Sequence, residues 1–485
     1  MPWDKNTNDP RVRIGPGGIM SVTFETCGNA IIIVRVDGRP ILATDPWLVG
    51  SCYFGSWMLD KPLTETQIRD IQSAEYVWIS HGHPDHLHPD SLDMLPPGKR
   101  VLVPDHYHPE IHDMLVARGF EVQNLGYRKW FVLSPEVRIC CVDNPNQDAI
   151  LVVETGQGIL INKNDSPFCG EFRFLRGLVR KWPRERTYLA ALCAIDADMK
   201  NIVDAAGDRV IEPPSAYKMG AIWATAREAD RLGVGSFCCS SSQHIYVRAD
   251  SVWANDYRIV WSDMKRHWAR PDVRLIQPYA TVDMDTREVT LNHPEQTSNT
   301  AAITGKTNGD DWQETLDDAE WRRVEAFFTQ FETLVGVLDF VDFTVGGERR
   351  SITIGFEGQA KPSRKRRGLH FQAPKSSLMT AVEYGFFDDL LIGNFMKTEL
   401  INMALYPDFT PLVAKYGGNA KVLTKDDLHR FHRRYLRRNP YAYLAWRLRR
   451  PIDNTVLPLA RAVAIKLGVG DMAKRIYRLM LGDPV

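Results

Sequence analysis

Short apolar runs separated by turn-forming residues dominate the first 290 positions of the chain. Runs such as A-I-I-I-V-R-V (30–36), R-V-L-V-P (100–104) and A-I-L-V-V-E (149–154) are rich in valine and isoleucine and are bounded by Gly, Asn or Asp. This pattern is typical of β-strands. Helical periodicity appears between such runs, at residues 108–118 and 225–232. This order of strand-like runs and helical segments predicts an α/β fold, an αββα sandwich of two facing sheets with helices outside.

The pattern changes near residue 309. A long stretch with helical periodicity and an acidic start follows, and then a strand pair around the turn at Gly346-Gly347. A basic loop is expected at 359–368, and from Ser376 onward the periodicity is mostly helical. We therefore predict one domain over residues 1–300 and an α-rich C-terminal region, α+β and then helical, over 301–485.

Composition narrows the classes of function. Lysine plus arginine and aspartate plus glutamate both number 60, so global charge gives no reason to expect a nucleic-acid partner. No apolar run reaches about 18 residues, so no membrane span is expected. The polar first residues lack the apolar core of a signal peptide. The adjacent pairs Cys140-Cys141 and Cys238-Cys239 lie in apolar runs and are expected to be buried free thiols. The absence of expected disulfides makes a reducing cytoplasm the simplest compartment.

A concentration of metal-type ligands follows the strand expected at 76–80. The run V-W-I-S-H-G-H-P-D-H-L places His81, His83, Asp85 and His86 within six positions, although the chain has only 13 histidines. In a tight loop, residues two apart can converge on one ion, and the adjacent Asp-His pair then faces a second ion. Imidazole and carboxylate together suit zinc, iron or manganese. The run therefore predicts a site for two metal ions.

This H-x-H-x-D-H run resembles the signature of the metallo-β-lactamase superfamily. The upstream segment I-I-I-V-R-V-D-G-R-P-I-L-A-T-D-P-W-L is similar to the opening strands of that fold. The resemblance implies a metallo-β-lactamase-like sandwich with the metal-binding catalytic site in residues 1–300. It also implies that Asp45 holds the metal loop from outside the ligand set, because such outer hydrogen bonds fix ligand orientation.

The superfamily usually supplies another histidine after the next strands, and this sequence departs from that pattern. It has no histidine between His112 and His244. Asp148, Asp143 or Asn146 must stand in, and we favour Asp148 because it leads directly into the next strand.

The remaining ligands also follow from the resemblance. Asp165 ends a strand where the superfamily places the carboxylate that bridges both metals, and His244 is the candidate for the last histidine. Asp85 and Asp165 are the candidate catalytic residues. The predicted metal ligands are His81, His83, Asp85, His86, Asp148, Asp165 and His244.

The flanking residues resemble one branch of the superfamily more specifically. D-P-W-L-V-G-S-C-Y-F-G-S-W-M-L, P-Y-A-T-V-D-M-D and the later F-F-D-D-L-L-I-G-N-F are similar to the catalytic part of CMP-N-acetylneuraminate hydroxylase-type proteins. That branch implies a non-haem iron monooxygenase. This sequence lacks the Rieske domain that precedes the catalytic part, so electrons are expected from a separate electron-transfer protein. The nucleotide-sugar substrate is not carried over.

Two reactions remain open for this site. A monooxygenase would use iron and O₂ to hydroxylate or N-oxygenate a polar small-molecule metabolite, and the carboxylate-rich ligand set favours it. A hydrolase would use two zinc or manganese ions to lower the pKa of a bridging water to about 7. Asp85 would then orient the attack on an ester, lactone or phosphodiester. A non-catalytic scaffold is the third hypothesis.

Two further groups of residues have open interpretations. The segment 428–450 contains eight arginines interleaved with aromatic residues. It is either a solvated helix face or a docking surface for an acidic partner or lipid head group, the latter a peripheral membrane contact. His106, His108 and His112 are expected in a solvated loop, or alternatively at the mouth of the cleft.

Overall fold

The computed structural model describes residues 20–192, 200–211, 218–292, 302–303, 305–355, 365–451 and 466. The polar N-terminal segment, most of the predicted basic loop 359–368 and the end of the chain lie outside the described residues.

The first layer of the sandwich is an eight-stranded mixed sheet with the order β19-β18-β1-β2-β3-β6-β7-β8. Strands β3, β6, β7 and β8 run parallel to one another, and the others pair antiparallel. The strands are β1 (Val22–Cys27), β2 (Ile31–Val36), β3 (Arg39–Thr44), β6 (Tyr76–Trp78), β7 (Arg100–Pro104), β8 (Glu121–Leu125), β18 (Ala280–Asp283) and β19 (Val289–Leu291).

The second layer is a seven-stranded sheet with the order β17-β15-β13-β12-β11-β10-β9. Its strands are β9 (Trp130–Val132), β10 (Val137–Asp143), β11 (Ala149–Thr155), β12 (Ile159–Asn164), β13 (Thr187–Ala191), β15 (Ser236–Cys239) and β17 (Arg274–Ile276).

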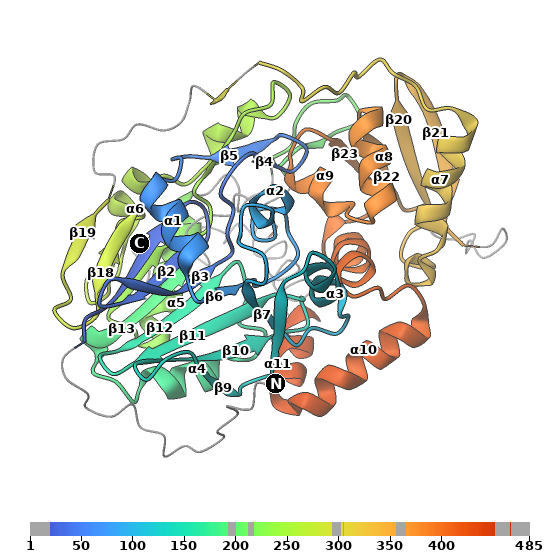
Figure 1. Ribbon diagram of the computed structural model, residues 1–485. Helices are drawn as coiled ribbons and strands as arrows, with labels where there is room; N and C mark the ends of the chain where they lie inside the picture. The colour runs from blue at the N-terminus through green and yellow to red at the C-terminus, as the bar shows by residue number, and fades with distance from the viewer. Residues whose placement is uncertain are drawn as a thin grey trace.

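Successive side chains along a strand point to opposite faces of the sheet, and this determines the core in which each one packs. In β2, Ile32 and Val34 face the second sheet, whereas Ile31 and Ile33 face outward to helices. The outer face of the first sheet is covered by α1 (Glu65–Ser73), α2 (Pro89–Leu92) and α3 (Glu110–Ala117). The second sheet is covered by α4 (Phe172–Val179), α5 (Lys218–Leu232) and α6 (Trp261–His267). Figure 1 shows these layers, and the predicted αββα sandwich is confirmed.

The adjacent cysteines follow the same rule. Cys141 and Cys238 lie in the core between the sheets, and Cys140 and Cys239 lie in the core beneath the helices. All four are buried and free of disulfides, as predicted.

A small sheet lies at the edge of the sandwich. It consists of β4 (Ser51–Cys52), β5 (Trp57–Leu59) and β16 (His244–Tyr246), in the order β16-β5-β4. It brings a segment that follows β3 together with a segment that follows β15.

The C-terminal region forms a second core around a five-stranded sheet with the order β14-β23-β22-β20-β21. Its strands are β14 (Ile202–Val203), β20 (Phe340–Val345), β21 (Glu348–Thr353), β22 (Gly368–Gln372) and β23 (Lys397–Ile401). The predicted strand pair around Gly346-Gly347 is the β20–β21 hairpin, and both glycines have positive φ. Strand β14 comes from within the first 300 residues, so the two parts of the chain share a sheet.

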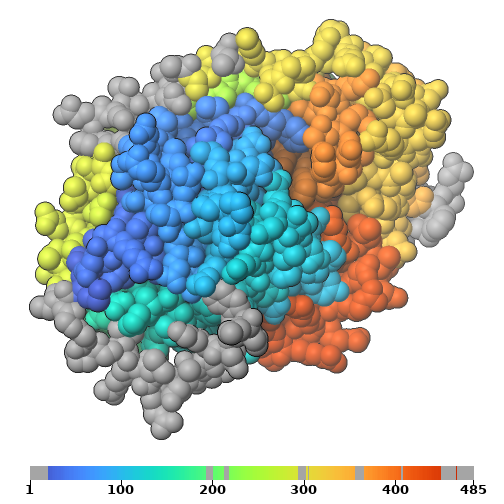
Figure 2. Space-filling model, viewed as in Figure 1, coloured from blue at the N-terminus to red at the C-terminus, as the bar shows by residue number. Residues whose placement is uncertain are grey.

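Helices surround this second sheet and reach the sandwich. They are α7 (Asp318–Thr329), α8 (Lys375–Tyr384), α9 (Asp388–Ile392), α10 (Lys425–Arg438) and α11 (Pro440–Pro451), with π-helical turns at Leu405–Phe409 and Pro411–Asn419. The predicted helical character after Ser376 is interrupted by β23, which pairs with β22 and β14. Figure 2 shows the orange and red C-terminal region lying directly against the blue and cyan part of the sandwich. None of the described helices is long and apolar enough to cross a membrane.

Candidate metal centre

The predicted ligand loop is a compact turn that begins where β6 ends. The backbone N–H groups of His86 and Leu87 both donate to the carbonyl of His83, at 3.0 and 2.8 Å. At the start of the loop, Ser80 N donates to Asp45 Oδ1 at 2.7 Å. Asp45 itself has a φ of 44°, in the left-handed region that aspartate tolerates better than most residues. The turn therefore brings the four loop side chains close together.

His81 and His83 approach each other through one nitrogen each. His81 Nε2 lies 2.8 Å from His83 Nδ1. The opposite nitrogens are held by protein groups, since His81 Nδ1 lies 2.9 Å from Ser80 Oγ and His83 Nε2 lies 3.1 Å from Asp388 Oδ2. An imidazole that binds a metal through one nitrogen usually has its other nitrogen held in this way.

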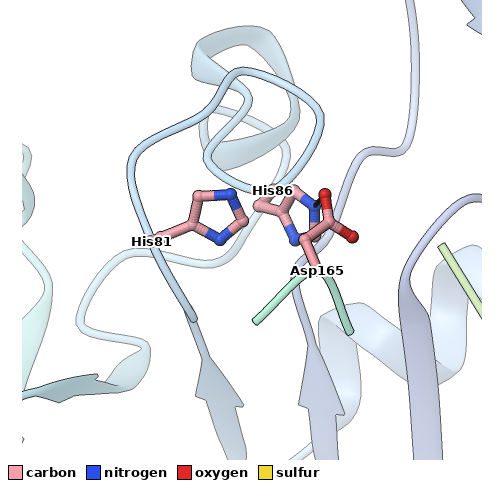
Figure 3. A group of neighbouring side chains, drawn as sticks. All are labelled: His81, His86 and Asp165. Carbon is pink, nitrogen blue, oxygen red and sulfur yellow. Dashed lines mark ion pairs between the residues drawn. The ribbon is translucent and has the colours of Figure 1, made fainter. Parts of the chain in front are cut away.

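His86 faces the same region from the other side of the loop. Its Nδ1 lies 3.1 Å from Asp45 Oδ2, so Asp45 contacts the loop at both Ser80 and His86. Its Nε2 has no hydrogen-bond partner and lies 3.4 Å from Asp165 Oδ2. Ligand atoms of His81, His86 and Asp165 all lie within 4.8 Å of one another (Figure 3). They form a grouping suited to a metal ion.

Asp85 is fixed by hydrogen bonds to both of its oxygens. Tyr53 Oη donates to Oδ1 at 2.6 Å, and Asn29 Nδ2 donates to Oδ2 at 2.8 Å. Oδ2 also lies 3.3 Å from His86 Nε2. Burial opposes ionisation, but the nearby charge of His86 prevails and keeps the pKa of Asp85 below its ordinary value. Asp85 is thus a rigid carboxylate beside His86.

His244 lies on β16 and is completely buried. Its ring stacks on Trp57, with centroids 3.4 Å apart and planes at 5°. Neither ring nitrogen has a hydrogen-bond partner. Burial, followed by the charge of Arg258, holds its pKa well below the ordinary value, while Asp85 and Asp165 act in the opposite direction. His244 is therefore a neutral imidazole whose nitrogens are free to bind a metal.

The three candidates for the missing histidine lie in different surroundings. Asp143 forms an ion pair with Arg438, and burial raises its pKa to about 6. Asp148 lies 3.8 Å from Lys415 Nζ, and the charges of His83, Asp165 and His86 all affect its pKa, which burial raises. Asp143 is thus engaged by Arg438, whereas Asp148 lies among the charges of other predicted ligands. Asn146 lies in the turn before it, where its backbone N–H donates to Asn144 Oδ1.

Of the seven predicted ligands, His81, His86 and Asp165 form the tight group. Several buried polar atoms of the predicted ligands have no hydrogen-bond partner: His86 Nε2, both nitrogens of His244, and Asp165 Oδ1. The charges of Asp85, Asp165 and Asp45 hold the pKa of His86 well above its ordinary value, although burial acts in the opposite direction. This surplus of negative charge around a buried imidazole is suited to a cation. Nitrogen and oxygen ligands in this mixture suit zinc, iron or manganese.

Four contacts to the site were absent from the sequence-based prediction. They come from Asn29, Tyr53, Asp388 and Lys415. Asp388 and Tyr53 had a signal, because they belong to the F-F-D-D and D-P-W-L-V-G-S-C-Y-F segments of the resemblance. Asn29 and Lys415 lie in segments without a recognisable motif.

A cavity of about 730 Å³ lies against the outer side of the ligand loop, at Gly82 and Pro84. Tyr53 and His106 line it from the sandwich, and Asp389 from the C-terminal region. A cavity shared by two parts of a chain is a common place for a small-molecule site.

The expectation of a solvated loop at His106 is wrong, and the alternative position at the cleft is right. His106 is only 9% exposed, its Nε2 lies 3.2 Å from the carbonyl of Ser80, and burial lowers its pKa to about 4. His108 also lines the cavity. His112 is partly exposed and pairs with Asp113. The tight packing of residues 105–108 against the ligand loop explains the difference.

Comparisons with known proteins support the resemblance. No family model matches the chain. It is similar to cytidine monophosphate-N-acetylneuraminic acid hydroxylase from Asterias rubens, with 32% identity over 97 residues, and to the Xenopus laevis protein of that name, with 34% over 96 residues. These matches cover 20% and 19% of this chain but only 14% and 15% of the relatives' own lengths.

Solved structures similar to this chain include two hydrolases and a metallo-β-lactamase-fold protein. The metallo-hydrolase Igni18 from Ignicoccus hospitalis has 16% identity and a TM-score of 0.34, covering 54% of this chain and 98% of its own. The isothiocyanate hydrolase from Delia radicum gut bacteria has 12% identity and a TM-score of 0.36, and the match covers 54% of this chain and 98% of the hydrolase. The Bacillus subtilis metallo-β-lactamase-fold protein YhfI has 11% identity and a TM-score of 0.30, and the match covers 54% of this chain and 99% of YhfI.

The class of protein follows from the chain's own features. The two facing sheets, with the H-x-H-x-D-H loop after β6, form the αββα sandwich expected from the metallo-β-lactamase resemblance. The grouped His81, His86 and Asp165 at its edge suit a metal-dependent enzyme.

Proposed function

We propose that this chain is a non-haem iron-dependent monooxygenase that hydroxylates or N-oxygenates a polar metabolite at a two-metal centre. The observation that carries the proposal is the buried carboxylate Asp148, in the loop where the resemblance implies a histidine. Oxygen ligands shift metal preference from zinc toward iron or manganese. The local likeness to named hydroxylases supports the same reaction class.

The chain's own residues would divide the work. In this proposal His81, His83 and Asp148 would hold one metal ion, and Asp85, His86 and His244 would hold the other. Asp165 lies beside His86 and would contribute a carboxylate to the same centre. Bound iron would supply the means to activate O₂ with two electrons. Overall, R–H, O₂, two electrons and two protons give R–OH and water.

The cavity beside the loop is the proposed substrate site. Tyr53 lines this cavity and donates a hydrogen bond to Asp85, so it connects the cavity wall to the ligand loop. Asp389, whose Oδ1 is buried without a hydrogen-bond partner, offers an acceptor to a polar substrate group.

Electrons would come from a donor outside these 485 residues, because the sequence contains no C-x-H segment paired with a later C-x-x-H for a Rieske centre. The candidate docking surface for an acidic donor comprises the exposed Arg433, Arg437 and Arg447 on α10 and α11. Arg434 and Arg438 are used internally, where both contact Asp105. This restricts the proposed surface to the outer side of the helices.

Metal reconstitution tests the proposal. The chain is purified without oxygen, loaded with Fe²⁺ or Zn²⁺, and assayed for bound metal, optical spectrum and reductant-dependent O₂ uptake. We expect tight iron binding and O₂ uptake by the iron form only. Two tightly bound zinc ions, esterase or phosphodiesterase activity and no response to iron would contradict the proposal and favour the hydrolase.

A single substitution sharpens this test. Asp148→His restores the ligand type usual in the superfamily and should shift binding competition from iron toward zinc. An unchanged iron-to-zinc preference would remove Asp148 as the basis of the proposal.

A further inference from the structure

The C-terminal region reaches the metal loop through one aspartate. Asp388 begins α9, and its Oδ2 lies 3.1 Å from His83 Nε2, although the two residues are 305 positions apart. Both side chains are largely buried, with 8% and 21% exposure. The contact is thus a buried ion pair or hydrogen bond between two regions of the chain.

Helix α9 is held in place on both sides of Asp388. Phe387, immediately before it, lies fully buried in the aromatic core among Phe328, Phe343 and Phe371. After the helix, the carbonyl of Gly393 accepts a hydrogen bond from Ser56 Oγ at 2.6 Å.

The next residue ties the helix to the small sheet. Asn394 Nδ2 donates to Tyr246 Oη at 3.2 Å, and Tyr246 belongs to the strand that carries His244. The position of Asp388 is therefore set by the second hydrophobic core and by the sheet next to the metal centre.

This contact determines which nitrogen His83 presents to the site. With Nε2 directed at Asp388, Nδ1 is left to face His81 Nε2 at 2.8 Å. A carboxylate on the far nitrogen fixes the tautomer and ring orientation and increases the ligand's basicity.

We propose that Asp388 is a positioning residue of the metal centre, so that the C-terminal region completes a site whose ligands all lie in the sandwich. This inference rests on the metal site proposed above and is independent of whether the bound metal supports oxygenation or hydrolysis. Asp388 acts through His83 and is not itself assigned as a ligand.

Metal affinity is the direct test. Co²⁺ binding to the full chain is measured by competition with a chromophoric chelator and by the visible spectrum of the bound ion. Asp388→Asn keeps the shape but removes the charge, and Asp388→Ala removes the contact. We expect affinity to fall about 10- to 100-fold, more for Ala than for Asn, with a changed Co²⁺ spectrum.

The chain offers a matched control in the five-stranded sheet. His370 Nδ1 lies 3.1 Å from Glu399 Oε2, and this pair is about as buried as the His83–Asp388 pair. Glu399→Gln removes the same type of contact from the same region, so it should leave Co²⁺ affinity and spectrum unchanged.

The outcomes separate this inference from the proposed function. Wild-type affinity in both Asp388 variants would overturn it, and so would equal losses in Asp388→Asn and Glu399→Gln. If Asp388→Ala does not fold, the nearly isosteric Asp388→Asn still decides. Tight zinc binding with hydrolysis by the wild type would overturn the oxygenase alone, whereas a wild type that binds no metal would overturn both.

Discussion

The sandwich and the C-terminal region contribute to one centre in different ways. The sandwich supplies the candidate ligands, four of them from one turn after β6. The C-terminal region supplies contacts behind those ligands, including Asp388 on His83 and Lys415 near Asp148. Ligand type is therefore encoded locally, whereas ligand orientation depends on residues hundreds of positions away.

The loop that carries Asp148 shows this division most clearly. Gln147 has a φ of 60°, which is uncommon for a residue with a side chain. Its Nε2 donates to Tyr435 Oη at 2.8 Å, and its Oε1 accepts from Tyr107 N at 3.2 Å. Helix α10 thus holds the unusual backbone conformation that immediately precedes Asp148.

Replacing a loop ligand should have the largest effect. His86→Ala removes an imidazole that lies within 3.4 Å of both Asp85 and Asp165, so we expect loss of at least one bound metal ion per chain. Elemental analysis after dialysis measures the number of metal ions bound per chain. The control is His88→Asn, because His88 caps α2 through Ser91 N and asparagine caps helices well. Equal metal content in His86→Ala and wild type would contradict the assignment of His86.

Asp148→Ala should have the next largest effect. We expect lower metal content, since Asp148 is the proposed third-position ligand. Asp143→Asn should retain the metal, because Asp143 is engaged by Arg438 instead. If the metal loss follows Asp143 and not Asp148, the two assignments must be exchanged.

Loss of the ion pair between Arg438 and Asp143 should mainly lower the stability of the fold. Arg438→Met leaves the buried carboxylate of Asp143 without its partner, which should lower the free energy of unfolding by about 3 kcal/mol. Denaturant titration of the metal-free chain measures this. Arg437→Met, at an exposed neighbouring position, should change it by less than about 0.5 kcal/mol. Similar losses in the two variants would show that α10 is sensitive to any substitution.

Tyr53→Phe should have the smallest effect. It removes one hydroxyl that donates to Asp85 Oδ1 at 2.6 Å and leaves the ring in place. Because Asn29 still donates to the other oxygen, we expect metal affinity to fall by no more than about tenfold. Chelator competition measures the change, and a loss as large as that of His86→Ala would mean that Tyr53 does more than orient Asp85.

The fold and the ligand loop could be predicted from the sequence because both depend on local order. Alternation in β2 places Ile32 toward one core and Ile33 toward another. The H-x-H-x-D-H spacing becomes a single turn because His83 accepts two backbone hydrogen bonds.

The supporting contacts could not be predicted, because they depend on how two cores meet. Nothing near Asp388 in the sequence indicates His83, and nothing near Arg438 indicates Asp143. The sequence favours a solvated position for His106, because its polar neighbours give no sign that the ligand loop covers it. Such pairings are set by packing between elements and leave no periodic signal.

The most direct test of the shared centre is the anomalous diffraction of crystals of the metal-loaded chain. We predict two ions about 3.5–4 Å apart. His81 Nε2 and His83 Nδ1 should bind one ion, His86 Nε2 and His244 the other, and Asp165 should bridge them, with Asp388 still on His83 Nε2. A single ion, or His83 bound through Nε2 with Asp388 displaced, would contradict a centre that both regions build.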